Sequence, residues 1–101
     1  MSKRSLEKSN KHFKKALKKL PLGVTSNFRY WGDDETIYIK RASGCRLWDL
    51  DDNEYIDYRL AYGPYILGYA DERVDQAARE GMDIGGVFAL ATELELSLIH
   101  I

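Results

Sequence analysis

Arg29 is the residue whose type and setting most directly suggest chemistry, because it follows Gly23 on a polar stretch. Residues 23–35 show neither helical nor strand spacing of apolar side chains, which predicts an extended loop between ordered elements. A guanidinium on such a loop can bind a substrate carboxylate through two parallel hydrogen bonds. By residue type alone, Arg29 is either such a ligand or a solvated surface charge.

Asp49, Asp51 and Asn53 have the alternating spacing that opens an EF-hand calcium loop. An EF-hand also needs Gly at its sixth position and Glu at its twelfth, where this sequence has Glu54 and Leu60. We therefore interpret the segment as a hairpin turn between strands. Asp and Asn favour such turns because they tolerate left-handed backbone and accept hydrogen bonds from nearby amides.

The other reactive side chains do not assemble into a recognisable site. His12 and His100 lie far apart in the sequence and have no second ligand nearby, so no metal site is predicted. Gly85 and Gly86 are not followed by the Gly-Lys-Ser/Thr of a phosphate loop. The single Cys45 cannot form an intrachain disulfide, and no apolar run approaches the roughly 18 residues of a membrane span. We therefore expect a cytoplasmic protein.

The first element that positions these residues is predicted to be a basic amphipathic helix. Apolar residues recur at helical spacing at Leu6, Phe13, Ala16, Leu17 and Leu20. We expect Ser2 or Ser5 to cap the start of this helix, and Pro21 to end it. Its apolar stripe is narrow, so the helix is expected to pack against a larger body.

Charge is distributed unevenly along the chain, although the formal net charge is −1. Residues 1–20 hold eight Lys or Arg and one acid, whereas residues 21–101 hold seven Lys or Arg and fifteen acids. Such a basic start is compatible with binding to nucleic acid or to another acidic surface. Nucleic-acid surfaces interleave aromatic residues with their cations, whereas Phe13 lies on the apolar stripe, so docking within the protein is the preferred interpretation.

Three short β-strands are predicted at residues 36–40, 46–50 and 54–58. Their connections are too short for crossovers, which requires antiparallel pairing. A turn is predicted at residues 61–65. The expected sheet is therefore a three-stranded meander that ends in a turn.

Helical patterns return in the last third of the chain. A short helix is predicted from Asp71 to Met82, and Thr92 with Glu95 has the spacing of a capping box that begins another helix. That helix would stop after about two turns in the apolar residues 96–101, which we interpret as a truncation.

Four segments together resemble the opening of the class III, pyridoxal-phosphate-dependent aminotransferases in order and spacing. They are residues 22–29 (Leu-Gly-Val-Thr-Ser-Asn-Phe-Arg), 44–58 (Gly-Cys-Arg-Leu-Trp-Asp-Leu-Asp-Asp-Asn-Glu-Tyr-Ile-Asp-Tyr), 62–68 (Tyr-Gly-Pro-Tyr-Ile-Leu-Gly) and 91–95 (Ala-Thr-Glu-Leu-Glu). Within the family the pattern is most similar to glutamate-1-semialdehyde aminomutase, whose first segment usually reads Gly-Gly-Val-Asn-Ser-Pro-Val-Arg. Ser26 and Arg29 fall on the serine and the arginine of that segment.

The resemblance implies an α+β fragment of the α/β type I pyridoxal-phosphate-dependent transferase fold, made of the basic helix, the antiparallel meander and short helices. It implies a homodimeric enzyme that transfers an amino group to or from an amino-acid or amino-aldehyde substrate. Arg29 would bind the substrate carboxylate, Ser26 would shape that end of the pocket, and Tyr62 would replace an aromatic wall residue that is commonly Trp. The lysine that carries pyridoxal phosphate is expected beyond residue 101, so the fragment alone is expected to be inactive.

The sequence departs from the family pattern at three places. Asn27 replaces a proline, which loosens the loop that carries Arg29, and Leu22 replaces a glycine. After Gly68, the usual His-x-His-Pro run of the family is replaced by Tyr69-Ala-Asp-Glu72. With Tyr in place of Trp at position 62, these changes leave a transaminase as plausible as the aminomutase.

Four regions are expected on this basis. Residues 1–21 form the N-terminal amphipathic helix, 22–70 the loop and sheet of the small domain, and 71–95 a helical start toward a large domain. Residues 96–101 (Leu-Ser-Leu-Ile-His-Ile) read like a translated sequencing adapter, so we consider a non-native origin for them. The alternative hypothesis is a non-catalytic small β module whose basic helix binds nucleic acid or an acidic surface.

Overall fold

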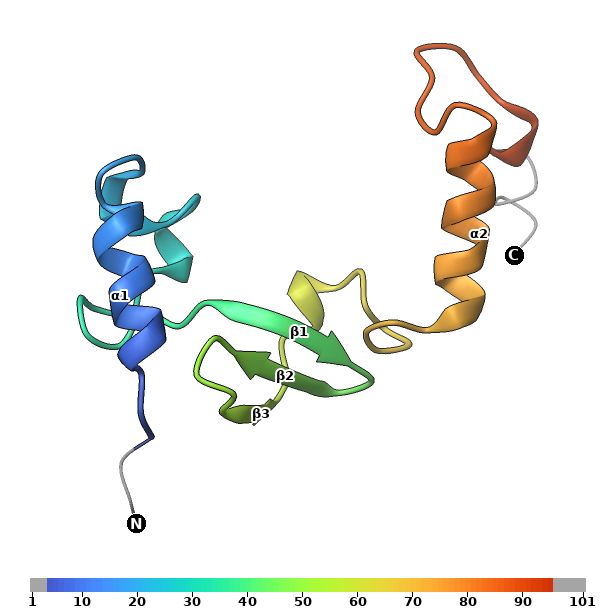
Figure 1. Ribbon diagram of the computed structural model, residues 1–101. Coiled ribbons are helices and arrows are strands. Elements are labelled where there is room, and N and C mark those ends of the chain that lie inside the picture. Colours follow the sequence, from blue (N-terminus) through green and yellow to red (C-terminus); the bar gives the residue numbers. More distant parts are fainter. Residues whose placement is uncertain (1–3, 96–101) are drawn as a thin grey trace. The chain divides into compact units, whose positions relative to one another are not determined.

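The computed structural model describes residues 4–95 and divides the chain into two compact units, Met1–Ala70 and Asp71–Ile101. The first unit holds helix α1 (Glu7–Ala16) and strands β1 (Ile39–Ser43), β2 (Arg46–Asp49) and β3 (Glu54–Ile56). The second holds helix α2 (Glu72–Asp83) (Figure 1). Within residues 4–95, no helix is long and apolar enough to cross a membrane.

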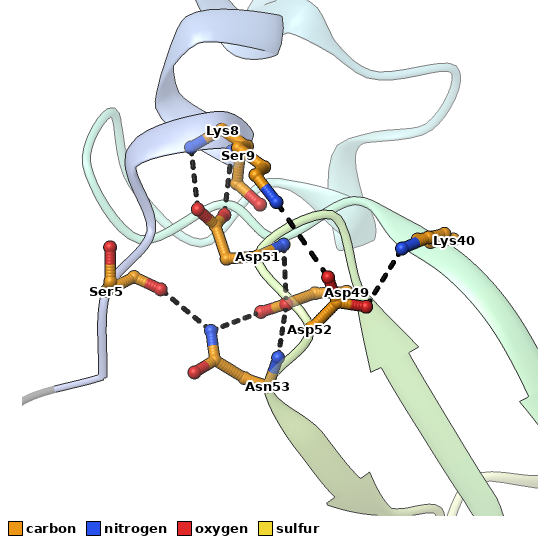
Figure 2. A network of polar contacts seen from close by, with 8 residues as sticks. All are labelled: Ser5, Lys8, Ser9, Lys40, Asp49, Asp51, Asp52 and Asn53. Carbon is orange, nitrogen blue, oxygen red and sulfur yellow. Dashed lines mark hydrogen bonds and ion pairs between the residues drawn. The ribbon is translucent and has the colours of Figure 1, made fainter.

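Helix α1 receives its N-terminal cap from the turn between β2 and β3. Its own N-cap residue, Leu6, has no side chain that can accept a hydrogen bond. The carboxylate of Asp51 accepts the backbone N–H groups of Lys8 at 2.7 Å and Ser9 at 2.9 Å (Figure 2). An anion at this position satisfies two orphan donors and complements the positive end of the helix dipole.

The observed ends of α1 differ from the prediction on both sides. A cap at Ser5 is wrong because Asp51 takes that role, and Ser2 lies outside the described residues. The apolar periodicity continues to Leu20, but the regular helix ends at Ala16. The residues between them form tighter turns that bond three as well as four residues back, so the apolar pattern outlasts the helix.

The three strands form an antiparallel meander in the order β1-β2-β3, which confirms the predicted topology. The loop between β1 and β2 is the dipeptide Gly44-Cys45, enclosed by the paired residues Ser43 and Arg46. Two-residue loops of this kind are typical of tight β-hairpins.

The predicted position of the first strand is wrong by three residues, because the strand begins at Ile39 rather than Thr36. Thr36 is fully buried, and its hydroxyl donates to the carbonyl of Gly32 at 2.7 Å. The same oxygen accepts the Trp31 N–H at 3.1 Å. The β-branched residue therefore closes a turn rather than entering the sheet.

The turn between β2 and β3 is organised around Asp49, which is fully buried. Its Oδ1 accepts the backbone N–H groups of Asp51 and Asn53, both at 2.9 Å (Figure 2). Its Oδ2 accepts the Asn53 side-chain amide at 2.9 Å and the Tyr55 hydroxyl at 2.8 Å. Asp52 has φ +65. These bonds confirm the interpretation of the acidic segment as a hairpin turn with left-handed backbone.

A close contact joins the hairpin to the segment that follows the sheet. Gly44 and Tyr69 exchange two backbone hydrogen bonds, both 2.8 Å long. Gly68 permits this approach, because its φ is +86 and a Cβ there would lie 2.9 Å from the Gly44 carbonyl oxygen. The last glycine of the Tyr-Gly-Pro-Tyr-Ile-Leu-Gly segment is therefore required by the backbone.

The apolar core of the described residues is small and is built on Phe13, whose exposed fraction is 3%. Gly23 lies against this ring, and a Cβ on Gly23 would lie 2.9 Å from two of its carbons. The Tyr38 hydroxyl donates to the Gly23 carbonyl at 2.8 Å. Packing and hydrogen bonding thus hold the start of the Arg29 loop between Phe13 of helix α1 and Tyr38, the residue before β1.

The second unit is described through Glu95. Asp71 is the N-cap of α2 and accepts the backbone N–H of Arg73 at 3.1 Å. The Glu95 carboxylate accepts the Thr92 N–H at 3.0 Å, which is one half of the predicted capping box. The proposed non-native tail, residues 96–101, lies outside the described residues.

Candidate substrate-binding groove

A groove of about 740 Å³ lies in the first unit. Its lining comes from the loop within residues 20–31, from residues 37–39 and 55–62, and from His12 and Leu47. Most of these side chains are apolar or aromatic, and few are charged. A concave apolar surface with a few polar groups is the usual form of a small-molecule site.

Arg29, the residue predicted to bind a substrate carboxylate, is one of the residues that line this groove. It ends a short 3-10 turn, Asn27–Arg29, that follows the extended residue Ser26. Its Nη1 donates to the Thr25 hydroxyl at 3.2 Å, and its guanidinium lies 5.0 Å from the centre of the Phe28 ring. The exposed guanidinium thus keeps donors available for an anion.

Tyr62 lines the same groove, whereas Ser26 is not among the lining residues. The Tyr62 ring meets the Phe28 ring edge-on, with centroids 4.9 Å apart. Phe28 is the neighbour of Arg29, so the structure brings Arg29 and Tyr62 to one surface. Ser26 instead acts through its backbone, where its carbonyl accepts the Arg29 N–H at 3.0 Å.

The backbone that carries Tyr62 is held in an uncommon conformation. Leu60, Ala61 and Tyr62 have φ values of +51, +48 and +66, all in the left-handed region. Each such residue other than glycine costs about 1–2 kcal/mol. Strain of this kind concentrates at functional sites, where the surrounding contacts hold the backbone in place.

Arg59 is a groove residue that the sequence analysis missed. Its Nη1 donates to the Tyr62 hydroxyl at 2.7 Å, and its guanidinium lies 5.4 Å from the Trp31 ring centre. Its backbone N–H bonds the Asp57 carboxylate at 2.7 Å. The signal that could have revealed it is this Asx-type turn, because Asp often binds the amide two residues on and so fixes that residue's direction.

Asp57 is the acidic residue of the groove lining. Burial alone would raise the pKa of its carboxyl, but hydrogen bonds from the Arg59 and Leu60 amides and the Tyr69 hydroxyl hold that pKa below its ordinary value. Burial and the bond to Asp57 raise the pKa of Tyr69 to about 12. At neutral pH the pair is therefore a carboxylate that accepts from a neutral phenol.

Comparison with known proteins agrees with this architecture. Residues 29–96 match the family described as Aminotransferase class-III. Glutamate-1-semialdehyde 2,1-aminomutase from Sulfurihydrogenibium sp. (strain YO3AOP1) is 44% identical over 94 residues, which cover 91% of this chain and 22% of that protein.

Solved structures give the same result. A transaminase with PLP bound has a TM-score of 0.79 at 26% identity, covering 92% of this chain and 22% of that one. An omega-transaminase from Sphaerobacter thermophilus has a TM-score of 0.77 at 30% identity, covering 87% of this chain and 20% of that one.

The fold is that of the N-terminal segment of pyridoxal-phosphate-dependent aminotransferases, as predicted. Within that class, the chain belongs to the class III aminotransferase family. It spans about a fifth of the length of the curated relatives it matches. The alternative of a stand-alone β module that binds nucleic acid is not supported by these findings.

Proposed function

We propose that the full-length protein is a pyridoxal-phosphate-dependent aminotransferase or aminomutase that transfers an amino group. In this proposal the present segment contributes the carboxylate-binding wall of the substrate site. Arg29 binds the carboxylate of an amino-acid or amino-aldehyde substrate, Tyr62 forms an aromatic wall, and Ser26 shapes the loop that presents Arg29. The homology to glutamate-1-semialdehyde 2,1-aminomutases supports the reaction class.

The observation that carries the proposal is the setting of the Arg29 guanidinium. It lies in a mainly apolar groove, and its side-chain hydrogen bond goes to the neutral hydroxyl of Thr25. Three other arginines, Arg46, Arg73 and Arg79, pair with carboxylates. A guanidinium beside apolar walls binds an incoming carboxylate more strongly than one in bulk water.

The residues of this segment do not fit the covalent end of the cofactor. Pyridoxal phosphate supplies the electron sink for amino transfer once a lysine holds it. Lys40 is the last lysine of the sequence, does not line the groove, and bonds Asp52 at 2.9 Å. We therefore assign the cofactor to the remainder of the full-length protein and propose that this segment alone is inactive.

The proposal extends to the assembly. Large apolar side chains are exposed in both units, including Ile56 at 55% in the first and Val87 at 95% in the second. The family's large domain and a second copy of the protein in a homodimer would cover such surfaces. We propose a homodimer on this basis. The proposal of a cytoplasmic location rests instead on the lone Cys45, which fits a reducing compartment.

Kinetics of Arg29→Met in the full-length enzyme test the substrate role. We expect kcat/KM for the amino-acid substrate to fall by about 10- to 100-fold, because a hydrogen bond to a charged group contributes about 1.5–3 kcal/mol. Arg41→Met is the matched control, since Arg41 lies over the Trp48 ring at 3.6 Å and does not line the groove. Equal kinetics in the two variants would overturn the role of Arg29.

The inactivity of the segment is tested separately. The 101-residue chain is incubated with pyridoxal phosphate and reduced with borohydride, and its mass is then measured by mass spectrometry. We expect no site-specific cofactor adduct. Stoichiometric labelling of one lysine, with loss of the cofactor absorbance band, would contradict the assignment.

A further inference from the structure

The groove contains a second guanidinium, and from it we infer that Arg59 selects substrates that carry two carboxylates. This inference rests on the proposed function, because it takes the groove as the substrate site. Arg29 holds one carboxylate and Arg59 holds the other. A substrate with a single carboxylate leaves Arg59 bound to Tyr62 and water.

The orientation of Arg59 is fixed at both ends of the residue. The Asp57 carboxylate accepts its backbone N–H at 2.7 Å, and the Tyr62 hydroxyl accepts from its Nη1 at 2.7 Å. The guanidinium lies near two rings, 5.4 Å from the centre of Trp31 and 5.7 Å from that of Tyr62. A guanidinium has five N–H donors in a rigid fork, so one bond to a phenol leaves several for a ligand.

The charge balance of the groove favours an anionic ligand. Among residues 4–95, neither Arg29 nor Arg59 forms an ion pair with an acidic side chain. The acid in the groove lining is Asp57, whose oxygens already accept two backbone amides and the Tyr69 hydroxyl. The groove therefore holds two guanidinium groups and one carboxylate, and that carboxylate already accepts most of the hydrogen bonds it can.

The two guanidiniums are separated by a pair of aromatic rings. The Arg29 guanidinium lies 5.0 Å from the centre of the Phe28 ring, and the centroids of the Phe28 and Tyr62 rings are 4.9 Å apart. The Tyr62 hydroxyl accepts a hydrogen bond from Arg59 Nη1 at 2.7 Å. Apolar methylene groups pack well on such rings, while charged ends need the flanking donors. This arrangement matches a short dicarboxylic amino acid or oxo acid lying along Phe28 and Tyr62.

The test uses the full-length enzyme and two acceptors of equal chain length, 2-oxoglutarate and 2-oxopentanoate. We expect Arg59→Met to lower kcat/KM for 2-oxoglutarate by about 10-fold or more and to leave that for 2-oxopentanoate within about twofold, because only the first carries a second carboxylate. Arg59→Lys, which keeps the charge, should retain part of the preference. Arg41→Met should match the wild type with both acceptors.

A binding measurement makes the result independent of turnover. Isothermal titration of the wild-type enzyme should show tighter binding of glutarate than of pentanoate, and Arg59→Met should abolish that difference. Equal losses with both ligands would overturn the inference and would show that Arg59 only supports Tyr62. Failure of the proposed function is distinguishable, because then Arg29→Met would change neither acceptor.

Discussion

The carboxylate of Asp51 accepts the backbone N–H of Ser9 at 2.9 Å, although the two residues are 42 positions apart (Figure 2). Its other oxygen accepts the N–H of Lys8 at 2.7 Å. The turn between β2 and β3 therefore caps helix α1 and fixes its start on the sheet. Because α1 packs Phe13 against Gly23, the cap also bears on the loop that carries Arg29.

The first prediction concerns this cap. Asp51→Ala should weaken the docking of α1 by about 1–2 kcal/mol, the usual effect of removing an N-cap side chain. Faster amide hydrogen exchange in α1 would report the loss, measured by mass spectrometry of the peptide that contains Phe13. The control is Asp52→Ala, which removes only exposed ion pairs to Lys8 and Lys40. Similar exchange in both variants would contradict the capping role.

The same cap should depend on pH. Burial alone would raise the pKa of Asp51, but the Lys8 and Ser9 amides lower it below its ordinary value. A carboxyl with a lowered pKa in the folded state stabilises that state above the unfolded pKa, which is about 3.9. The protection of α1 should therefore be constant near neutrality and fall as the pH drops below about 4. Protection that stays unchanged down to about pH 2 would contradict this expectation.

The source of the cap shows why sequence patterns located the helix but not its first residue. Helical periodicity is local, so Phe13 and its neighbours were sufficient to predict α1. The capping group is remote, and no local rule connects Asp51 to Ser9. The choice of Ser5 followed the ordinary preference for a nearby hydroxyl, which a tertiary contact replaced.

The first strand was misplaced for a related reason. Thr36 and the residues after it alternate as a strand does, and that pattern is equally compatible with a buried turn. The polar residues Arg41 and Ser43 have weaker strand preference, but they are ordered by pairing with β2 across the Gly44-Cys45 loop. Pairing partners, rather than composition, set the bounds of β1.

Leu22 provides a prediction about backbone strain. Its φ is +56, a conformation that favours glycine, and its exposed fraction is 47%. Leu22→Gly relieves about 1–2 kcal/mol of strain but loses about 0.5–1 kcal/mol through greater freedom of the unfolded chain. We expect a net gain of about 0.5 kcal/mol in the free energy of unfolding, measured by urea titration with tryptophan fluorescence.

The matched control for this change is Leu17→Gly. Leu17 is equally exposed, at 48%, but its φ of −54 is ordinary right-handed backbone. Glycine there should destabilise by about 0.5–1 kcal/mol, since it only adds unfolded-state freedom. If both variants changed the free energy of unfolding in the same direction, strain at Leu22 would not be the cause of the change.

Asn27 provides a prediction about the Arg29 loop. It occupies the first position of the Asn27–Arg29 turn, where proline is favoured because the N–H has no partner within the turn. The preceding Ser26, with φ −155 and ψ 141, already has the extended backbone that proline requires of its neighbour. Asn27→Pro should stabilise the chain by about 0.4–1 kcal/mol and raise the urea midpoint. The control is Asn27→Ala, which removes the side-chain amide without adding the proline constraint. Equal changes in the urea midpoint of the two variants would refute a stabilising role of proline at this position.

The residues of the groove were predictable only in part, because sequence patterns report local structure and the groove also depends on contacts between distant residues. Arg29 stood out because its loop resembles a family segment, and the structure places it in the groove with Tyr62. Arg59 carries no such motif, and its role depends on the left-handed turn at Leu60 and on the bond to Tyr62. The Asp57 residue type could have signalled an ordered backbone at Arg59, but the contact of its side chain with Tyr62 depends on the strained turn that follows.

The Asp57–Tyr69 pair supports a prediction at alkaline pH. Burial, followed by the bond to Asp57, raises the pKa of Tyr69 to about 12. When folding raises the pKa of an acid, its contribution to stability is fully present at pH values below the pKa of the unfolded state. That unfolded pKa is about 10 for tyrosine. That contribution is lost as the pH rises from about 10 to about 12, so the urea midpoint should fall across this range.

Tyr69→Phe tests the assignment, because phenylalanine keeps the ring stacked at 4.4 Å on Tyr65 and removes the hydroxyl that bonds Asp57. The variant should be less stable at neutral pH and should lose part of the decline between about pH 10 and 12. Some decline should remain, since burial and Asp49 likewise raise the pKa of Tyr55 to about 12. Tyr65→Phe leaves the Asp57 bond intact and removes only a smaller contribution to the raised pKa of Tyr69, so it should keep most of the wild-type decline. A Tyr69→Phe profile parallel to the wild type over this range would show that the pair does not couple folding to pH.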